Sequence, residues 1–322
     1  MELLRAASLT KHFTVTKTLG GVDVLKAVDG VDFAVDRDSI VALVGESGCG
    51  KSTVARLLLR LINPTSGSVL FRGKDVFSMS GRDLKAFRKS VQIIFQDPFA
   101  SLNPRRTIYD TVSEPLIIHG LAQRRDMKDR VVGILDQVGL GPEVLTRYPH
   151  EFSGGQRQRI CIARALAVSP EIIVADEPLS ALDVSIQAQI VNLLQELKKR
   201  SGISFILISH DLRMVHYFSD MVGVMYLGKI VEYAKTDGLF EKPFHPYTEL
   251  LLASAPRIEI RGKAGLRAAP LTGEVPSPIN IPTGCPFHPR CPKRFSPCDK
   301  TVPKLQESGG RLVSCHLWNP YE

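Results

Sequence analysis

A nine-residue segment constrains the fold of this chain more than any other feature. It is Gly45-Glu46-Ser47-Gly48-Cys49-Gly50-Lys51-Ser52-Thr53, which fits the pattern of glycine, four residues and Gly-Lys-Ser/Thr. The preceding run Ile40–Val44 is wholly apolar, as expected of a strand buried on both faces of a parallel sheet. After the segment, apolar residues recur at helical spacing, at Val54, Leu57, Leu58 and Leu61. The order of strand, glycine loop and helix predicts a phosphate-binding α/β fold.

This loop is expected to bind the phosphates of a nucleotide, as in an ATPase. Its backbone N–H groups and the positive end of the following helix attract anions. Lys51 is expected to reach the β- and γ-phosphates, and Ser52 to bind Mg²⁺. A glycine-rich turn that binds nothing is the alternative, which the flanking strand and helix disfavour. The remaining nucleotide-binding candidates in the loop are Gly45, Ser47, Gly48, Cys49, Gly50 and Thr53.

Composition excludes several other classes of protein. The chain has 322 residues, 44% hydrophobic and 23% charged, which is ordinary for a globular protein of one large and one smaller domain. We find no apolar run of membrane-spanning length and no signal peptide, and we expect a cytoplasmic protein. The net charge of +8 could suit nucleic acid or an anionic membrane, but no long basic run supports either, and a solvated surface is favoured.

Two further segments carry candidate catalytic groups. The apolar run 172–175 predicts a strand that delivers Asp176 and Glu177 to its carboxyl end, where open α/β sheets bind ligands. Asp176 is expected to order the Mg²⁺ shell, and Glu177 to orient or deprotonate an attacking water. The next predicted strand, 204–209, ends at His210, which could contact the γ-phosphate or the water. The alternatives are a solvated turn for the carboxylates and a structural histidine.

A second anion-binding segment begins a predicted helix. It contains Ser153, Gly154, Gly155 and Gln156, and apolar residues follow at helical spacing. A simple helix cap would explain Ser153 alone but not the whole string. Elsewhere we expect a small antiparallel sheet in the first forty residues, with a loop around 17–22, and helices from about 102 to 167.

The character of the chain changes after about residue 240. Of 21 prolines, 13 fall in residues 241–322, so this segment is expected to be an irregular appendage. Its cysteines, Cys285, Cys291, Cys298 and Cys315, are candidates for a metal site, because disulfides are improbable in a reducing compartment. Cys49 and Cys161 are expected to be packing residues.

Taken together, these residues resemble the ATP-binding subunits of ABC transporters. The resemblance rests on the ordered set Gly45 to Thr53, Gln96, Ser153 to Gln156, Asp176-Glu177, Ser180-Ala181-Leu182-Asp183 and His210. Segments 95–104, 245–248 and 285–292 resemble the dipeptide/oligopeptide-importer subgroup, which also includes importers of nickel, glutathione and oligosaccharides. The fold implied is an ABC-type P-loop ATPase core with a small antiparallel β subdomain and a helical signature subdomain. This core would span 1–240, with the helical subdomain at about 97–167, and the appendage would span 241–322.

The resemblance also implies roles and partners. Phe13 would stack on adenine, Gln96 would touch Mg²⁺ and link to the membrane subunits, Glu177 would be the general base, and His210 would hold the γ-phosphate. Ser153 to Gln156 and Asp183 would act on ATP held by a second ATPase subunit, head to tail, which we expect to be a different protein. Two transmembrane permeases and, indirectly, an extracytoplasmic substrate-binding protein complete the implied importer, with this chain peripheral on the cytoplasmic face of the inner membrane. The rival class, an ABC-type ATPase acting on nucleic acid or the ribosome, is disfavoured because sustained heptads are missing between the motifs.

The metal at the four cysteines is open from spacing alone. Five, six and sixteen residues separate them, without the tight pair usual for zinc and unlike common ferredoxin patterns. The importer subgroup is associated with a [4Fe–4S] cluster at these positions, so we favour the cluster over zinc, with four unligated thiols third. Its role would be structural or regulatory.

Overall fold

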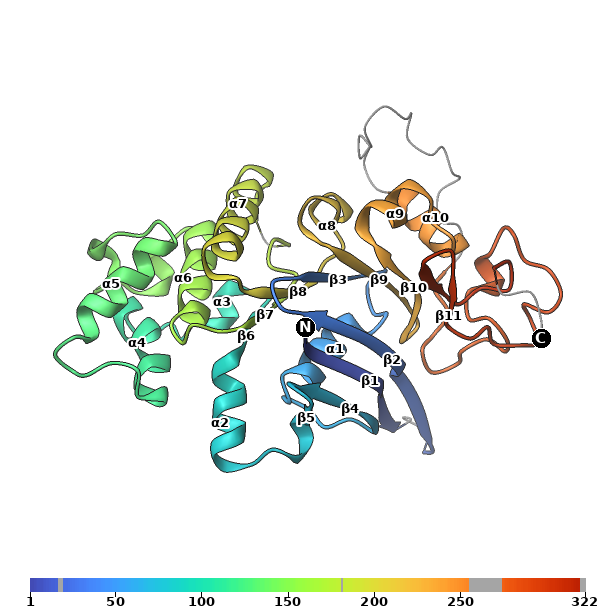
Figure 1. Ribbon diagram of the computed structural model, residues 1–322, viewed down its shortest axis with the longest axis horizontal. Coiled ribbons are helices and arrows are strands. Elements are labelled where there is room, and N and C mark those ends of the chain that lie inside the picture. Colours follow the sequence, from blue (N-terminus) through green and yellow to red (C-terminus); the bar gives the residue numbers. More distant parts are fainter. Residues whose placement is uncertain (17–19, 181, 255–273, 319–322) are drawn as a thin grey trace. The chain divides into compact units, whose positions relative to one another are not determined.

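The computed structural model describes residues 1–16, 20–180, 182–254 and 274–318 (Figure 1). The chain forms two compact units, each assembled from segments distant in sequence. The helical unit contains Met1 and residues 36–39 and 78–207; the phosphate-loop unit contains residues 2–35, 40–77 and the described part of 208–322.

The main sheet of the phosphate-loop unit is built on β3 (Ile40–Val44), whose five residues are all buried as the sequence predicts. β3 pairs in parallel with β9 (Met221–Tyr226). From β9 the sheet continues through antiparallel strands in the order β10, β12, β11, which span Lys229–Lys235, Arg311–Val313 and Gln306–Ser308. Strands β11 and β12, which lie near the end of the chain, therefore extend the sheet that contains β3.

A second sheet in this unit has the order β2-β1-β4-β5. Its strands are β1 (Glu2–Thr16), β2 (Val22–Asp36), β4 (Ser66–Phe71) and β5 (Lys74–Asp75). The predicted antiparallel sheet is confirmed, but β1 and β2 are 15 residues each rather than short. Of the predicted loop at 17–22, residues 17–19 lie outside the described residues.

Helix α1 (Lys51–Leu58) follows the glycine loop and buries Val54, Leu57 and Leu58. The helix ends before Leu61, which is 54% exposed, so the expected helical position of Leu61 is wrong. Arg60 adopts a left-handed φ of 51°, and the Leu61 N–H donates to the Arg56 carbonyl at 2.8 Å. This is the hydrogen bond of a helix-terminating Schellman turn.

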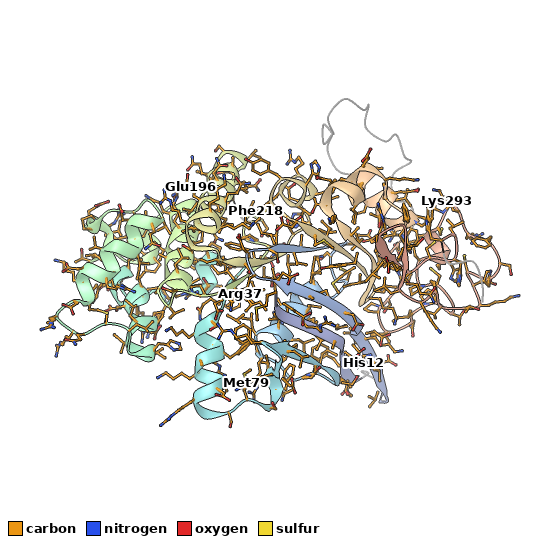
Figure 2. The ribbon with its side chains drawn as sticks, in the orientation of Figure 1. His12, Arg37, Met79, Glu196, Phe218 and Lys293 are labelled. Carbon is orange, nitrogen blue, oxygen red and sulfur yellow. The ribbon has the colours of Figure 1, made fainter. Side chains whose placement is uncertain are left out.

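The other helices of the phosphate-loop unit are short. They are α8 (Leu212–Phe218), α9 (Thr236–Glu241), α10 (Pro246–Ser254) and the 3₁₀ turns η1 (Val76–Ser78) and η4 (His288–Arg290). Phe218, labelled in Figure 2, is buried at the end of α8. The described residues 274–318 are irregular apart from η4, β11 and β12.

The helical unit contains strands in the order β8-β7-β6, of which β6 and β7 pair in parallel. They span Ser204–Ile208, Ile172–Asp176 and Val91–Ile94. Helix α6 (Gly154–Leu166) contacts four others, namely α3 (Pro98–Ser101), α4 (Ile108–His119), α5 (Met127–Gln137) and α7 (Val184–Ser201). Figure 1 shows α4, α5 and α6 gathered in the green part of the ribbon. The unit is completed by α2 (Gly81–Ser90), η2 (Pro142–Val144) and η3 (Pro149–Glu151).

Candidate functional site

The glycine loop has a conformation that only glycine tolerates at its last position before α1. Gly50 has φ 107°, and a Cβ there would lie 2.1 Å from the Ala27 carbonyl oxygen of β2. Such a contact is far inside van der Waals distance, and the φ disfavours L side chains. The loop therefore packs its backbone directly against β2 and directs the N-terminus of α1 toward the expected phosphates.

Lys51 is buried at the start of α1, with 5% of its surface exposed. Its Nζ donates to the carbonyl oxygens of Gly45 at 2.8 Å and Glu46 at 3.0 Å. These bonds hold the ammonium inside the loop, where it can exchange a carbonyl for a phosphate oxygen. Ser52 and Thr53 are half-buried in the first turn of the helix. Burial raises the pKa of the Cys49 thiol, which agrees with a packing role.

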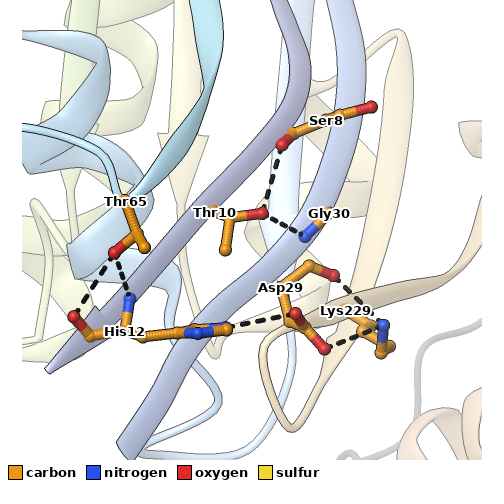
Figure 3. Close-up of polar contacts among 7 residues, drawn as sticks. All are labelled: Ser8, Thr10, His12, Asp29, Gly30, Thr65 and Lys229. Carbon is orange, nitrogen blue, oxygen red and sulfur yellow. Dashed lines mark hydrogen bonds and ion pairs between the residues drawn. The ribbon is translucent and has the colours of Figure 1, made fainter.

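Phe13 lies on β1 and is 36% exposed, with the Lys11 Nζ 5.1 Å from its ring centroid. A partly exposed ring has a face available for stacking. The preceding His12 lies in a charged network that no sequence motif predicts (Figure 3). Its Nε2 is 3.2 Å from Oδ1 of Asp29 on β2, and Lys229 of β10 lies 3.0 Å from Oδ2 of that carboxylate. Burial opposes ionisation of Asp29, but the Lys229 and His12 contacts outweigh it and lower its pKa.

His210 lies in the exposed turn between β8 and α8. The turn is fixed on both sides of the histidine. The Asp211 N–H donates to Ser209 Oγ at 3.0 Å, and Asp211 Oδ1 accepts from the N–H groups of Arg213 and Met214 to cap α8. The phosphate loop, Phe13, His210 and the four C-terminal cysteines thus belong to the phosphate-loop unit, and the remaining candidates belong to the helical unit.

In the helical unit, two of the predicted catalytic residues are in direct contact. Gln96 Nε2 donates to Glu177 Oε2 at 2.9 Å. Asp176 is the last residue of β7 and is 7% exposed. Glu177 has a left-handed φ of 47°, a conformation that costs a non-glycine residue ~1–2 kcal/mol. The sheet edge therefore holds Glu177 in a strained conformation with its carboxylate against the amide of Gln96.

The segment from Ser153 forms a reciprocal cap on α6. Ser153 Oγ accepts from the Gln156 N–H at 3.4 Å, and Gln156 Oε1 accepts from the Ser153 N–H at 3.1 Å. Gly155 permits close packing, because a Cβ there would lie 2.5 Å from Ile186 Cγ2 of α7. Asp183 precedes α7, but its side chain does not cap that helix. Ala181 lies outside the described residues.

Glu46 of the glycine loop pairs with a residue of the cysteine-rich segment that the sequence did not single out. Arg290 donates to both Glu46 carboxylate oxygens, from Nη1 at 2.7 Å and from Nη2 at 3.0 Å. Tyr247 Oη accepts from the Glu46 N–H at 2.9 Å. The only sequence signal was indirect, since these partners lie in the two C-terminal segments that resemble peptide importers.

The four C-terminal cysteines line one small cavity. Cys285, Cys298 and Cys315 are each 8% exposed, and Cys291 is half-buried. Burial, followed by smaller effects that include the neighbouring thiols, raises the pKa of Cys285 to about 11 and that of Cys315 to about 12. All six cysteines of the chain carry free thiols. Among the described residues, no group of three or more His, Cys, Asp or Glu side chains is arranged to hold a single metal ion.

Comparison with known proteins places this geometry in a family. Residues 28–180 match the ABC transporter family, and residues 231–298 match the oligopeptide/dipeptide transporter C-terminal region. The chain is 49% identical to the putative oligopeptide transport ATP-binding protein YkfD of Bacillus subtilis, over 100% of this chain and 97% of the relative. It is 44% identical to the dipeptide transport ATP-binding protein DppF of Escherichia coli, over 97% of this chain and 93% of the relative.

A solved structure agrees with these sequence relatives. The ATP-binding cassette MJ0796, in a dimeric post-hydrolysis state bound to ADP and Pi, superposes with a TM-score of 0.65 at 27% identity. The match covers 73% of this chain and 99% of that one. In the part of this chain that the structure describes, no helix is both long and apolar enough to cross a membrane. The chain belongs to the ABC transporter family, as an ATP-hydrolysing subunit with the C-terminal region of oligopeptide/dipeptide transporters.

Proposed function

We propose that this subunit powers an importer of dipeptides or oligopeptides. The observation that carries the proposal is the end-to-end match to relatives whose names specify oligopeptide or dipeptide transport, including the C-terminal region. Nickel, glutathione and oligosaccharides are the alternative cargoes. The test is to reconstitute the subunit with its permeases, its partner ATPase and its substrate-binding protein in vesicles, and to compare ATP turnover with each cargo. Stimulation by peptides supports the proposal; stimulation by nickel or a sugar alone would overturn the peptide assignment.

For the reaction itself, we propose a division of labour among named side chains. Phe13 stacks on adenine, and Lys51 binds the β- and γ-phosphates together with the loop N–H groups. Ser52, Gln96 and Asp176 hold or order Mg²⁺, which supplies charge stabilisation to the transferring phosphoryl group. Glu177 takes the proton of the attacking water, and His210 holds the γ-phosphate. The hydrogen bond between Gln96 and Glu177 supports this assignment, because it fixes the base beside a proposed Mg²⁺ ligand.

We propose that a second subunit completes the ATP-binding site. Ser153, Gly154, Gly155, Gln156 and Asp183 would act on the nucleotide bound by the partner, which we expect to be a different ATPase. The position of Ser153 to Gln156 at the start of α6 supports this role, because the N-terminus of a helix attracts phosphate. The pair would bind two transmembrane permeases at the cytoplasmic face of the inner membrane.

We also propose that the four cysteines hold a metal centre within a C-terminal domain that begins near residue 241. Four thiols line one cavity, burial raises the pKa values of Cys285, Cys291 and Cys315, and a bound cation would stabilise the thiolates. We favour [4Fe–4S] over zinc, because the segment around Cys285 and Cys291 resembles the importer subgroup that is associated with such a cluster. Anaerobic purification followed by iron, sulfide and zinc analysis decides between them. Stoichiometric zinc without iron would exclude the cluster, and no metal would exclude both.

A further inference from the structure

Glu46 contacts the rest of the phosphate-loop unit through all of its polar groups. Its carbonyl oxygen accepts from Lys51 Nζ, its N–H donates to Tyr247 Oη, and its carboxylate accepts from Arg290. The Arg290 side chain is only 5% exposed and that of Glu46 is 23% exposed. This ion pair is bidentate and largely removed from solvent. Charge-assisted hydrogen bonds of this type are stronger than those between neutral groups.

Arg290 is carried by a short turn that two cysteines bracket, residues 285–291, which we call the cysteine turn. Backbone hydrogen bonds run from His288 to Cys285, from Arg290 to Phe287 and from Cys291 to His288. A further bond joins the Cys285 N–H to the Cys298 carbonyl at 2.8 Å. The orientation of Arg290 therefore depends on a backbone whose two ends carry cysteines of the shared cavity.

An aromatic cluster anchors this turn to the cassette. Phe287 is 1% exposed, and its ring centroid lies 5.3 Å from those of both Tyr226 and Tyr247. Tyr247 is the residue whose hydroxyl accepts from Glu46. Phe287 of the cysteine turn and Glu46 of the glycine loop thus both contact Tyr247. This shared contact places Arg290 where it can donate to both carboxylate oxygens of Glu46.

We propose that Arg290 is a positioning residue for the phosphate loop, and that it transmits the state of the cysteine turn to nucleotide binding. Arg290 neutralises the only carboxylate within the loop and fixes the residue whose carbonyl holds Lys51. Without the guanidinium, a desolvated anion would remain beside the place where the phosphates bind, and would repel them. The inference rests on ATP binding at this loop and is independent of the proposed metal centre.

The experiment measures Mg²⁺–ADP affinity of the full chain by calorimetric titration, because ADP is not consumed. We expect Arg290→Gln to weaken ADP binding about tenfold, because it leaves the Glu46 charge unpaired. Adding Glu46→Gln to Arg290→Gln should recover affinity to within about threefold of the unmodified chain, because the repelling charge is gone. A residue that only supported the fold would show no such rescue.

Lys293→Gln is the matched control. Lys293, labelled in Figure 2, lies in the same C-terminal segment and contacts both Glu249 carboxylate oxygens at 2.7 Å. Glu249 lies on α10 and not in the glycine loop. This variant should leave ADP affinity unchanged. Equal losses in Arg290→Gln and Lys293→Gln, or the absence of rescue by Glu46→Gln, would overturn the positioning role.

Arg290→Lys keeps the test decisive if Arg290→Gln does not fold. Lysine retains the charge but not the two-pronged contact, so we expect an intermediate loss of about two- to fivefold. An unchanged affinity would overturn the inference. Absence of ADP binding by the unmodified chain would instead contradict ATP binding at the loop, so the two failures are distinguishable.

Transmission from the cysteine turn is tested with Cys291→Ser. In the otherwise unmodified chain this change should weaken ADP binding, because it loosens the turn that orients Arg290. In the Glu46→Gln, Arg290→Gln double variant the same change should have no effect, because the contact is already removed. An equal effect in both backgrounds, or no effect in either, would overturn Arg290 as the route.

Discussion

Replacing Gly50 by alanine should destabilise the protein before any nucleotide binds. A Cβ at this position meets a backbone oxygen, that of Ala27, at 2.1 Å, so no side-chain rotation can relieve the overlap. The left-handed backbone adds ~1–2 kcal/mol for a non-glycine residue, and relieving such an overlap by a backbone shift costs a further ~1–3 kcal/mol. We therefore expect Gly50→Ala to reduce the free energy of unfolding by ~2–5 kcal/mol.

Gly48→Ala separates the two contributions. Gly48 also has a positive φ, 79°, but a Cβ there would meet nothing within 4 Å. Its cost should be the conformational part alone, ~1–2 kcal/mol. Alanine restricts the unfolded chain by the same amount at both positions, so this effect cancels in the comparison.

Denaturant unfolding of both variants without nucleotide measures this difference directly. Mg²⁺–ATP titration then shows whether the displaced loop of Gly50→Ala still binds phosphate, and we expect that it does not. Equal destabilisation of the two variants would refute the argument that β2 confines the loop at Gly50. A Gly50→Ala variant as stable as the unmodified chain would refute it as well.

Four further outcomes are expected. Glu177→Gln should retain ATP binding but lower turnover at least ~100-fold, because the general base is lost; turnover within about threefold of the unmodified enzyme would remove that role. Lys51→Ala should weaken ATP binding itself by at least ~10-fold, and an unchanged affinity in direct titration would contradict the loop assignment. ATP turnover per molecule should rise with protein concentration or added partner ATPase, and a rate independent of both would refute the shared site. Burial lowers the pKa of His245 from 6.5 to about 3. Between these pH values the unfolded chain binds the proton more tightly than the folded chain, so the free energy of unfolding decreases as the pH is lowered. From pH 7 to pH 5 the loss should be ~2 kcal/mol in denaturant unfolding and should shrink in His245→Gln; equal pH dependence in both would contradict it.

The sequence predicts the elements whose signals are local. The run Ile40–Val44 and the spacing after Lys51 predict β3 and α1, and the Ser153 string marks the start of α6. In each case the residues that define the element are neighbours along the chain. The apolar spacing predicts too long a helix α1, because Leu61 continues the spacing although the left-handed φ of Arg60 ends the helix before it.

The missed features are long-range contacts. Arg290 and Glu46 are 244 positions apart, and Lys229 and Asp29 are 200 apart, so no periodicity or motif connects them. The left-handed φ of Glu177 was also unpredictable, because nothing in its neighbours demands it. Such pairings and strains are set by the packing of complete units rather than by local preference.

The pairing of Arg290 with Glu46 also concerns the time at which the loop is completed during synthesis. At translation rates of ~5–20 residues per second, the sequence separation of 244 positions takes roughly 10–50 s to synthesise. During that interval the nascent chain contains the glycine loop, but Arg290 has not yet been synthesised to pair with the Glu46 carboxylate. β12, which pairs with β10, arrives later still. A chain that terminates before residue 290 would therefore contain the glycine loop without the ion pair between Arg290 and Glu46 that positions it.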